Sequence, residues 1–124
     1  MTNNYARGQK DSRPWGTWEV TDCGEGFCVK HIMVQPGGIL SLQSHQFRNE
    51  HWVIVGGTAI VTLGEEKLVK NAGESVFIPA QTKHRIQNAS ALPMDFVEVQ
   101  CGDNLDENDI VRYEDVYGRV PAKA

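Results

Sequence analysis

The chain has 124 residues, with 12 basic and 16 acidic side chains and a formal net charge of −4 at neutral pH. This length suits one domain with a self-sufficient core, and the lack of a long basic run argues against nucleic acid or an anionic membrane as a partner. The apolar runs are too short for a membrane span and the polar N-terminus has no signal-peptide core, so we expect a cytoplasmic protein.

Polar residues open the chain, and we expect residues 1–12 to form a flexible N-terminal arm before one domain over 13–124. Short runs of β-branched and aromatic residues then recur between Gly-, Pro- and Asn-rich turn signals, with almost no helical periodicity. These runs predict strands within residues 17–22, 27–34, 39–45, 50–57, 58–64, 66–73, 75–80, 84–89 and 94–100. Many short strands at close spacing indicate an all-β sandwich or small barrel.

The last part of the domain differs from the strands before it. Segment 103–119 is acidic, and we expect a loop with a short helical turn that folds back on the sheet. The three cysteines, Cys23, Cys28 and Cys101, lack the spacing of a metal-binding pair, so we interpret them as free, partly buried thiols.

Strand alternation sorts the polar side chains around residue 50 by face. Glu50 lies on one face of its strand and His51 on the other, so both cannot enter one site. Gln43 and His45 are two residues apart and share a face. We expect His51 to pack between sheets rather than to take part in chemistry.

Two spaced patterns carry the strongest signal. They read G-x5-Q-x-H-x4-E-x6-G over residues 37–57 and G-x5-P-x-Q-x2-H-x3-N over residues 73–88. They resemble the paired motifs of the cupin superfamily, which usually have His in place of the first Gln and Gly in place of the second. The resemblance implies a cupin double-stranded β-helix, which is a jelly-roll-like barrel.

The same resemblance implies a metal site made by Gln43, His45, Glu50 and His84. Two imidazoles, one carboxylate and one amide oxygen would suit one divalent ion per chain, with Zn²⁺ expected and Mn²⁺, Fe²⁺, Co²⁺ or Ni²⁺ as alternatives. The competing interpretation is that these are satisfied polar residues in a barrel that has lost its metal.

A narrower resemblance covers residues 13–119. The stretches "RPWGTWEV", "GESVFIPAQTKHRIQN" and "VEVQCGDNLDENDIVRYEDVYGR" are similar to the type II mannose-6-phosphate isomerase cupin, which usually follows a mannose-1-phosphate guanylyltransferase domain. The Gln in the ligand set is usual in that family. Gln46, Phe47 and Gln81 depart from its pattern beside ligand-bearing segments, where they can reshape the pocket.

The narrower resemblance implies interconversion of fructose 6-phosphate and mannose 6-phosphate. A metal would stabilise the negative charge of an enediolate, and a base would move a proton between C1 and C2. Lys30 and Glu98 are the inward-facing catalytic candidates; a plain ion pair between them is the alternative.

The sugar phosphate partner also needs cationic ligands for its phosphate. Arg48, Arg112 and Arg119 are the predicted phosphate-binding residues, with Lys83 and Arg85 also available. We expect a homodimer, because small barrels leave edge strands that pairing can cover.

Two other functions remain open. One is a non-catalytic sugar- or metabolite-binding cupin. The other is a non-haem iron dioxygenase, since His45, Glu50 and His84 alone make a set of two histidines and one carboxylate.

Overall fold

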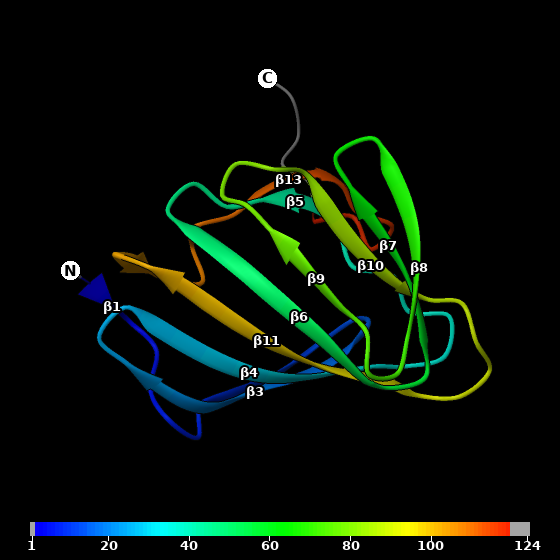
Figure 1. Cartoon of the computed structure of the whole chain (residues 1–124), viewed down its shortest axis with the longest axis horizontal. Helices are drawn as coiled ribbons and strands as arrows, with labels where there is room; N and C mark the ends of the chain where they lie inside the picture. Colours follow the sequence, from blue (N-terminus) through cyan, green and yellow to red (C-terminus); the bar gives the residue numbers. More distant parts are fainter. Residues whose placement is uncertain (1, 120–124) are drawn as a thin grey trace.

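Two antiparallel sheets face each other in the computed structural model, which describes residues 2–119 (Figure 1). The larger sheet has, in spatial order, β2 (Lys10–Arg13), β3 (Gly16–Gly24), β4 (Phe27–Val34), β11 (Met94–Gly102), β6 (Arg48–Gly56) and β9 (Ser75–Ile78). The smaller sheet has β13 (Val111–Glu114), β5 (Leu42–Ser44), β10 (His84–Asn88), β7 (Thr58–Leu63) and β8 (Glu66–Asn71). A short parallel pair joins β1 (Thr2–Asn3) to β12 (Asn104–Leu105). Each predicted run contains a strand, which confirms the all-β prediction.

The core lies between the two sheets, where alternate residues of each strand point inward. Along β6 from residue 48 to residue 55, residues at even positions are buried and those at odd positions are exposed. Trp52 and Ile54 of this strand meet Phe96 of β11, and Ile86 reaches the same core from the smaller sheet. Burial of each such side chain contributes about 1.5–3 kcal/mol, so this layer holds the sheets together.

Two turns show how the motifs fix the backbone. Gly57 joins β6 to β7 with a φ of 88°, and a Cβ there would lie 3.1 Å from Met94. Gln81 has a φ of 67° and is the sole residue other than glycine with positive φ in the described chain. The cupin motif has glycine at this position, so Gln81 takes a backbone conformation that favours glycine.

The structure corrects two expectations about the ends of the chain. Residues 1–12 were expected to form a loose arm, but they contain β1 and all of β2 except its last residue, Arg13, and these strands pair with β12 and β3. Segment 103–119 was expected to include a helical turn, but within its described residues it forms β12, β13 and turns instead. The short strands β1, β12 and β13 were missed because their partners lie far away in the sequence, whereas β2 pairs with the adjacent β3 but is a polar stretch without a strand pattern of its own.

His51 occupies the outer face of the larger sheet. It is exposed and stacks on Phe77, with ring centroids 4.5 Å apart. The expectation that it packs between sheets is therefore wrong, while its separation from Glu50 is confirmed. The three cysteines are free thiols, as interpreted from the sequence, but only Cys23 is partly buried, since Cys28 is buried and Cys101 is exposed. The described part of the chain contains no helix that could cross a membrane.

Candidate metal centre

Three buried side chains converge between the two sheets. His45 follows β5, His84 begins β10, and Glu50 lies on the inward face of β6 in the opposite sheet. They are 4%, 1% and 1% exposed, and one ligand atom from each lies within 4.8 Å of the other two. The structure therefore brings together three of the four predicted metal ligands, which we call the metal cluster.

Hydrogen bonds orient both imidazoles of the metal cluster. The Nδ1–H of His45 donates to the carbonyl of Asp109 at 2.7 Å, and that of His84 donates to the carbonyl of Thr82 at 2.9 Å. A carbonyl can only accept, so each Nε2 keeps its lone pair. His84 Nε2 is buried without a hydrogen-bond partner among the described residues. This backbone-anchored arrangement is typical of histidines that ligate a metal.

Burial sets the charge of the metal cluster. Burial lowers the pKa of His45 to about 4, although Glu50 opposes that change, and burial likewise lowers the pKa of His84. Burial opposes ionisation of Glu50 too, but the positive charge of Arg48 outweighs it and holds the pKa of Glu50 well below its usual range. Two neutral imidazoles and one carboxylate thus meet at neutral pH, which is the donor set of a divalent transition metal.

The residues present fit a divalent metal. The unpartnered Nε2 of His84 and the 3.2 Å separation between His45 Nε2 and Glu50 Oε2 place three donors around one point. The Nε1–H of Trp52 donates to the other oxygen of Glu50 at 2.9 Å and fixes the carboxylate. This indole was not among the residues singled out from the sequence.

Gln43 lies directly opposite His84 in the pairing of β5 with β10. Paired residues on neighbouring strands project to the same face, so Gln43 faces the same side as His84. Its Oε1 accepts a hydrogen bond from Ser41 Oγ at 2.9 Å. Its role as a fourth ligand stays a prediction.

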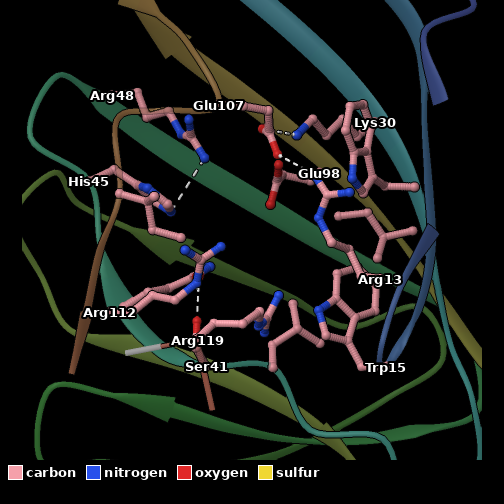
Figure 2. Close-up of a pocket in the computed structure, with 15 residues that line it drawn as sticks. Arg13, Trp15, Lys30, Ser41, His45, Arg48, Glu98, Glu107, Arg112 and Arg119 are labelled. Atoms are coloured by element: carbon pink, nitrogen blue, oxygen red, sulfur yellow. Dashed lines mark hydrogen bonds and ion pairs between the residues drawn. The ribbon is translucent and has the colours of Figure 1, made fainter. Parts of the chain in front are cut away.

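Arg48 lies against the metal cluster, where we had expected a phosphate ligand. Its Nε donates to Glu50 Oε2 at 2.9 Å, and its Nη2 lies 3.3 Å from His45 Nε2 (Figure 2). It is 6% exposed and also donates to the carbonyl of Asp106 at 3.2 Å. The guanidinium of Arg48 neutralises Glu50, and since Arg48 also lines the adjoining pocket, its role as a phosphate ligand stays a prediction.

A pocket adjoins the metal cluster; His45 of the cluster lines it, as do Gln43 and Arg48, which lie beside the cluster. Lys30, one of the predicted catalytic residues, lines this pocket and is 4% exposed. Its ammonium lies 2.6 Å from Glu107 and over the rings of Trp18 and Tyr5 (Figure 2). Lys30 therefore forms its ion pair with Glu107, and the alternative prediction of an ion pair with Glu98 is wrong.

Glu98, the second predicted catalytic residue, lies opposite Lys30 across β4 and β11 and also lines the pocket. Its carboxyl accepts hydrogen bonds from Trp52 Nε1 at 3.2 Å and from Gln100 Nε2 at 2.8 Å. Burial raises the pKa of Glu98 to about 8, and the charge of Glu50 adds to this effect. A carboxyl with this pKa exchanges its proton near neutral pH, as a general acid–base group must.

Three arginines from the two ends of the chain line the same pocket, and we call them the arginine cluster. Arg112 and Arg119 were predicted as phosphate ligands, while Arg13 was missed because it lies at the edge of the expected arm. Arg119 donates to Asp115 at 2.6 Å and Arg13 to Asp11 at 2.6 Å. The further candidates Lys83 and Arg85 do not line this pocket; Lys83 lies over the ring of Tyr113 instead.

The three departures from the family pattern lie outside the pocket. Gln46, Phe47 and Gln81 are exposed, and none is among the side chains that line the pocket. The expectation that they reshape the pocket is not met. Their position on the exterior removes an objection to the narrower resemblance.

Comparison with known proteins agrees with this geometry. The family model described as mannose-6-phosphate isomerase C-terminal matches residues 2–115. The chain belongs to this family. It is 50% identical over 112 residues to the xanthan biosynthesis protein XanB of Xanthomonas campestris pv. campestris, covering 90% of this chain and 24% of that protein. It is 47% identical over 108 residues to the mannose-1-phosphate guanylyltransferase ManC of Salmonella typhimurium, covering 87% of this chain and 22% of that protein. The chain thus spans about a quarter of the length of these family members.

A solved structure confirms the cupin fold of this family member. A protein from Klebsiella pneumoniae with a double-stranded β-helix domain superposes with a TM-score of 0.69 over 91% of each chain, at 18% identity. This likeness bears on the fold alone. Together with the motifs, it confirms the predicted double-stranded β-helix.

Proposed function

We propose that the chain is a metal-dependent aldose–ketose isomerase that interconverts fructose 6-phosphate and mannose 6-phosphate. The observation that carries the proposal is the contact between a buried metal cluster and a pocket that holds a proton-exchanging carboxyl. His45 belongs to both, and Glu98 lies in the pocket with its pKa raised to about 8. The match to the isomerase C-terminal family over residues 2–115 supports the choice of reaction.

A divalent cation held by His45, Glu50 and His84, with Gln43 as a further ligand, would supply Lewis-acid stabilisation of negative charge. In the aldose-to-ketose direction, the Glu98 carboxylate takes the proton from C2 and returns a proton to C1, while a hydroxyl proton passes from O2 to O1. The Lys30 ammonium provides a fixed positive charge beside the oxygens that become negative.

Arg48 has a supporting part in this scheme. Its hydrogen bond to Glu50 keeps that carboxyl ionised and therefore available as a metal ligand. Tyr5 donates to Glu107, and both residues contact or pair with Lys30. The N-terminal segment thus helps to hold the cation of the pocket in place.

The test is a coupled assay for each sugar phosphate, run after reconstitution with Zn²⁺, Mn²⁺, Co²⁺ or Ni²⁺. Turnover that depends on metal and is lost on chelation supports the proposal. Deuterium from solvent should enter the product at the carbon that receives the proton, unless Glu98 returns the same proton. Failure of all four metals to support turnover would refute it.

A non-catalytic sugar- or metabolite-binding cupin is the second candidate. The engagement of Lys30 with Glu107 and two aromatic rings favours it, because these contacts suit a resident cation rather than a free base. Binding of a sugar phosphate without turnover would support this candidate.

The dioxygenase is a third candidate, since the metal cluster contains two histidines and one carboxylate. Gln43, on the same face as His84, weighs against the dioxygenase, because its amide oxygen would occupy a further coordination position of the metal. Oxygen consumption by the iron-loaded protein would separate it from the isomerase. The homodimer expected from the edge strands stays a prediction, and sedimentation equilibrium would check it.

A further inference from the structure

Two of the three cysteines are direct partners in the hairpin of β3 and β4. β3 ends at Gly24 and β4 begins at Phe27, and the pairing register places Cys23 opposite Cys28. Paired residues of neighbouring strands project to the same face, so both thiols point toward the core between the sheets. Cys28 is fully buried in that core, and Cys23 is partly buried and packs against it.

The turn of the hairpin sets the distance between the two cysteines. Two residues separate the strands, and in such a hairpin the closing pair, here Gly24 and Phe27, is of the hydrogen-bonded kind. The two kinds of pair alternate along antiparallel strands, so the next pair, Cys23 and Cys28, is of the non-hydrogen-bonded kind, with Cα atoms about 4.5 Å apart. A disulfide joins Cα atoms about 4.4–6.8 Å apart, so these two cysteines can be bridged with little movement of the backbone.

The two thiols differ in what can reach them. Cys23 lines a surface depression together with Asn3 and Tyr5, and Cys28 does not line it. The S–H of Cys23 donates to the carbonyl of Tyr5 at 3.6 Å. Burial raises the pKa of the Cys28 thiol to about 12, so this thiol stays protonated and reacts only with a sulfur held beside it. An outside reagent therefore meets Cys23 first, and Cys28 is placed to react with Cys23.

Both sides of the hairpin are held in place, which keeps the thiols together. The Nδ2–H of Asn3 donates to the carbonyl of Gly24 at 2.7 Å and to that of Phe27 at 3.0 Å. Figure 1 shows β1, which contains Asn3, beside the tip of the hairpin. On the other side, Cys28 pairs with Gln100 of β11. Fixed neighbours favour a reaction within the chain over one between two chains.

We propose that Cys23 and Cys28 form a thiol–disulfide site that reacts with low-molecular-weight disulfides such as oxidised glutathione. The free thiols of the structure are its reduced form. The thiolate of Cys23 attacks one sulfur of the reagent, which breaks the S–S bond of the reagent, forms a mixed disulfide and releases one glutathione thiolate. The thiolate of Cys28 then attacks Cys23 Sγ, which forms the protein disulfide and releases the second glutathione thiolate. The two thiol protons pass to the released thiolates, so the protein is oxidised by two electrons and the reagent is reduced by two.

The thiol–disulfide site lies beneath a residue that contacts the pocket. The Lys30 ammonium lies 4.6 Å from the ring centroid of Tyr5, whose hydroxyl donates to Glu107. Formation of the disulfide removes the S–H that Cys23 donates to the carbonyl of Tyr5. Oxidation therefore removes one contact that holds Tyr5 in place. The reaction involves neither a metal nor a sugar phosphate, so it does not depend on the proposed function.

Thiol counting on the full chain tests the site. Cys101→Ser removes the exposed third thiol, so the two that remain report on the pair. After incubation with excess oxidised glutathione, this variant should lose both thiols and the mass of two hydrogen atoms, and dithiothreitol should restore both. Ellman's reagent added to the denatured sample counts the thiols, and mass spectrometry of the intact chain identifies the product. Retention of both thiols by the folded variant, when the urea-unfolded variant forms the disulfide, would overturn the proposal.

Two further variants in the Cys101→Ser background test the order of the steps. Cys28→Ala keeps a small apolar side chain in the core, and its reaction should stop at a mixed disulfide with one glutathione on Cys23. Cys23→Ser should slow the loss of the Cys28 thiol at least about 10-fold, because burial shields this thiol from the reagent. Thermal unfolding of the reduced variants checks that each is folded. Equal rates of thiol loss with and without Cys23→Ser would contradict attack by Cys23 and overturn the site.

Discussion

The metal cluster adjoins the pocket that the arginine cluster lines, with His45 belonging to both the metal cluster and the pocket wall, but the two clusters are built in different ways. His45, Glu50 and His84 are almost fully buried, and backbone carbonyls orient both imidazoles. The arginines are half-buried, and the two that have partners rely on carboxylates of nearby residues, Asp11 and Asp115.

The difference follows from where each cluster sits in the sheets. The metal cluster rests on β5, β6 and β10, which are paired on both sides within the sheets. The arginines come from the edge strands β2 and β13 and the turn after β13. The structure thus combines a rigid inner site with an outer site that depends on the chain ends. Changes at the inner site should affect metal and stability, whereas changes at the outer site should affect ligand choice.

Removing an inner ligand should have the largest effect. His84→Ala is expected to weaken metal binding by more than about 100-fold, beyond the usual effect of losing a residue that only orients a ligand. Metal analysis after dialysis against a fixed free concentration measures this, with about one equivalent expected for wild type. His51→Ala is the control, since that exposed histidine lies on the outer face. Equal metal content in wild type and His84→Ala would place the metal elsewhere.

A substitution of Glu98 in the pocket wall should lower turnover without lowering metal binding. Glu98→Gln keeps the size of the side chain but cannot carry a proton, so turnover should fall by about 10²-fold or more. Metal content should stay near wild type, because Glu98 is not a metal ligand and shares with Glu50 the donor Trp52 Nε1, which Glu98→Gln leaves in place. Steady-state kinetics beside metal analysis measures both. Unchanged turnover would remove Glu98 from the proton transfer.

Lowering the pH should destabilise the metal-free protein through the residues of the metal cluster. The pKa of His45 falls from 6.5 to about 4 on folding because its burial disfavours the charged form. Its contribution to stability is therefore present above pH 6.5 and is lost as the pH falls towards 4, by about 3 kcal/mol in all. The lowered pKa of Glu50 acts in the same direction at lower pH.

Urea unfolding of chelated protein between pH 7 and 4 measures this loss. His45→Gln should flatten the profile between pH 6.5 and 4, because an amide does not titrate. An identical pH profile in the variant would show that another group governs acid sensitivity.

The smallest effect concerns the turn that supports the inner site. Gln81 donates its backbone N–H to the carbonyl of His45 at 2.7 Å while its φ is 67°. Gln81→Gly should relieve the conformational strain and stabilise the fold by up to about 1 kcal/mol, less the entropy that glycine loses on folding. The urea midpoint measures the gain. Gln46→Gly, at an exposed position without positive φ, should not stabilise.

Most of the predicted site residues were found from patterns among residues close together in the sequence. The motifs over 37–57 and 73–88, together with strand alternation, located His45, Glu50 and His84 and excluded His51. Alternation also placed Lys30 and Glu98 on the inward face, where both line the pocket. These inferences succeeded because the period of a strand fixes which neighbours share a face, whatever the rest of the fold does.

Contacts between distant segments required the tertiary structure. The partner of Lys30 is Glu107, which lies 77 residues further along the chain, and no local pattern joins them. Tyr5 looked like part of a loose arm, and Arg13, the first residue of the expected domain, was not singled out, yet Tyr5 is 7% exposed and Arg13 lines the pocket. The ion pair between Arg48 and Glu50 was not predicted either, because a sequence shows that an arginine is present but not which carboxylate it contacts. Local periodicity in the sequence determined the all-β class and the face of each strand residue, and the resemblance of the two motifs to the cupin superfamily implied the barrel and the metal cluster. Only the packing of β1, β2, β12 and β13 decided which charges complete the pocket.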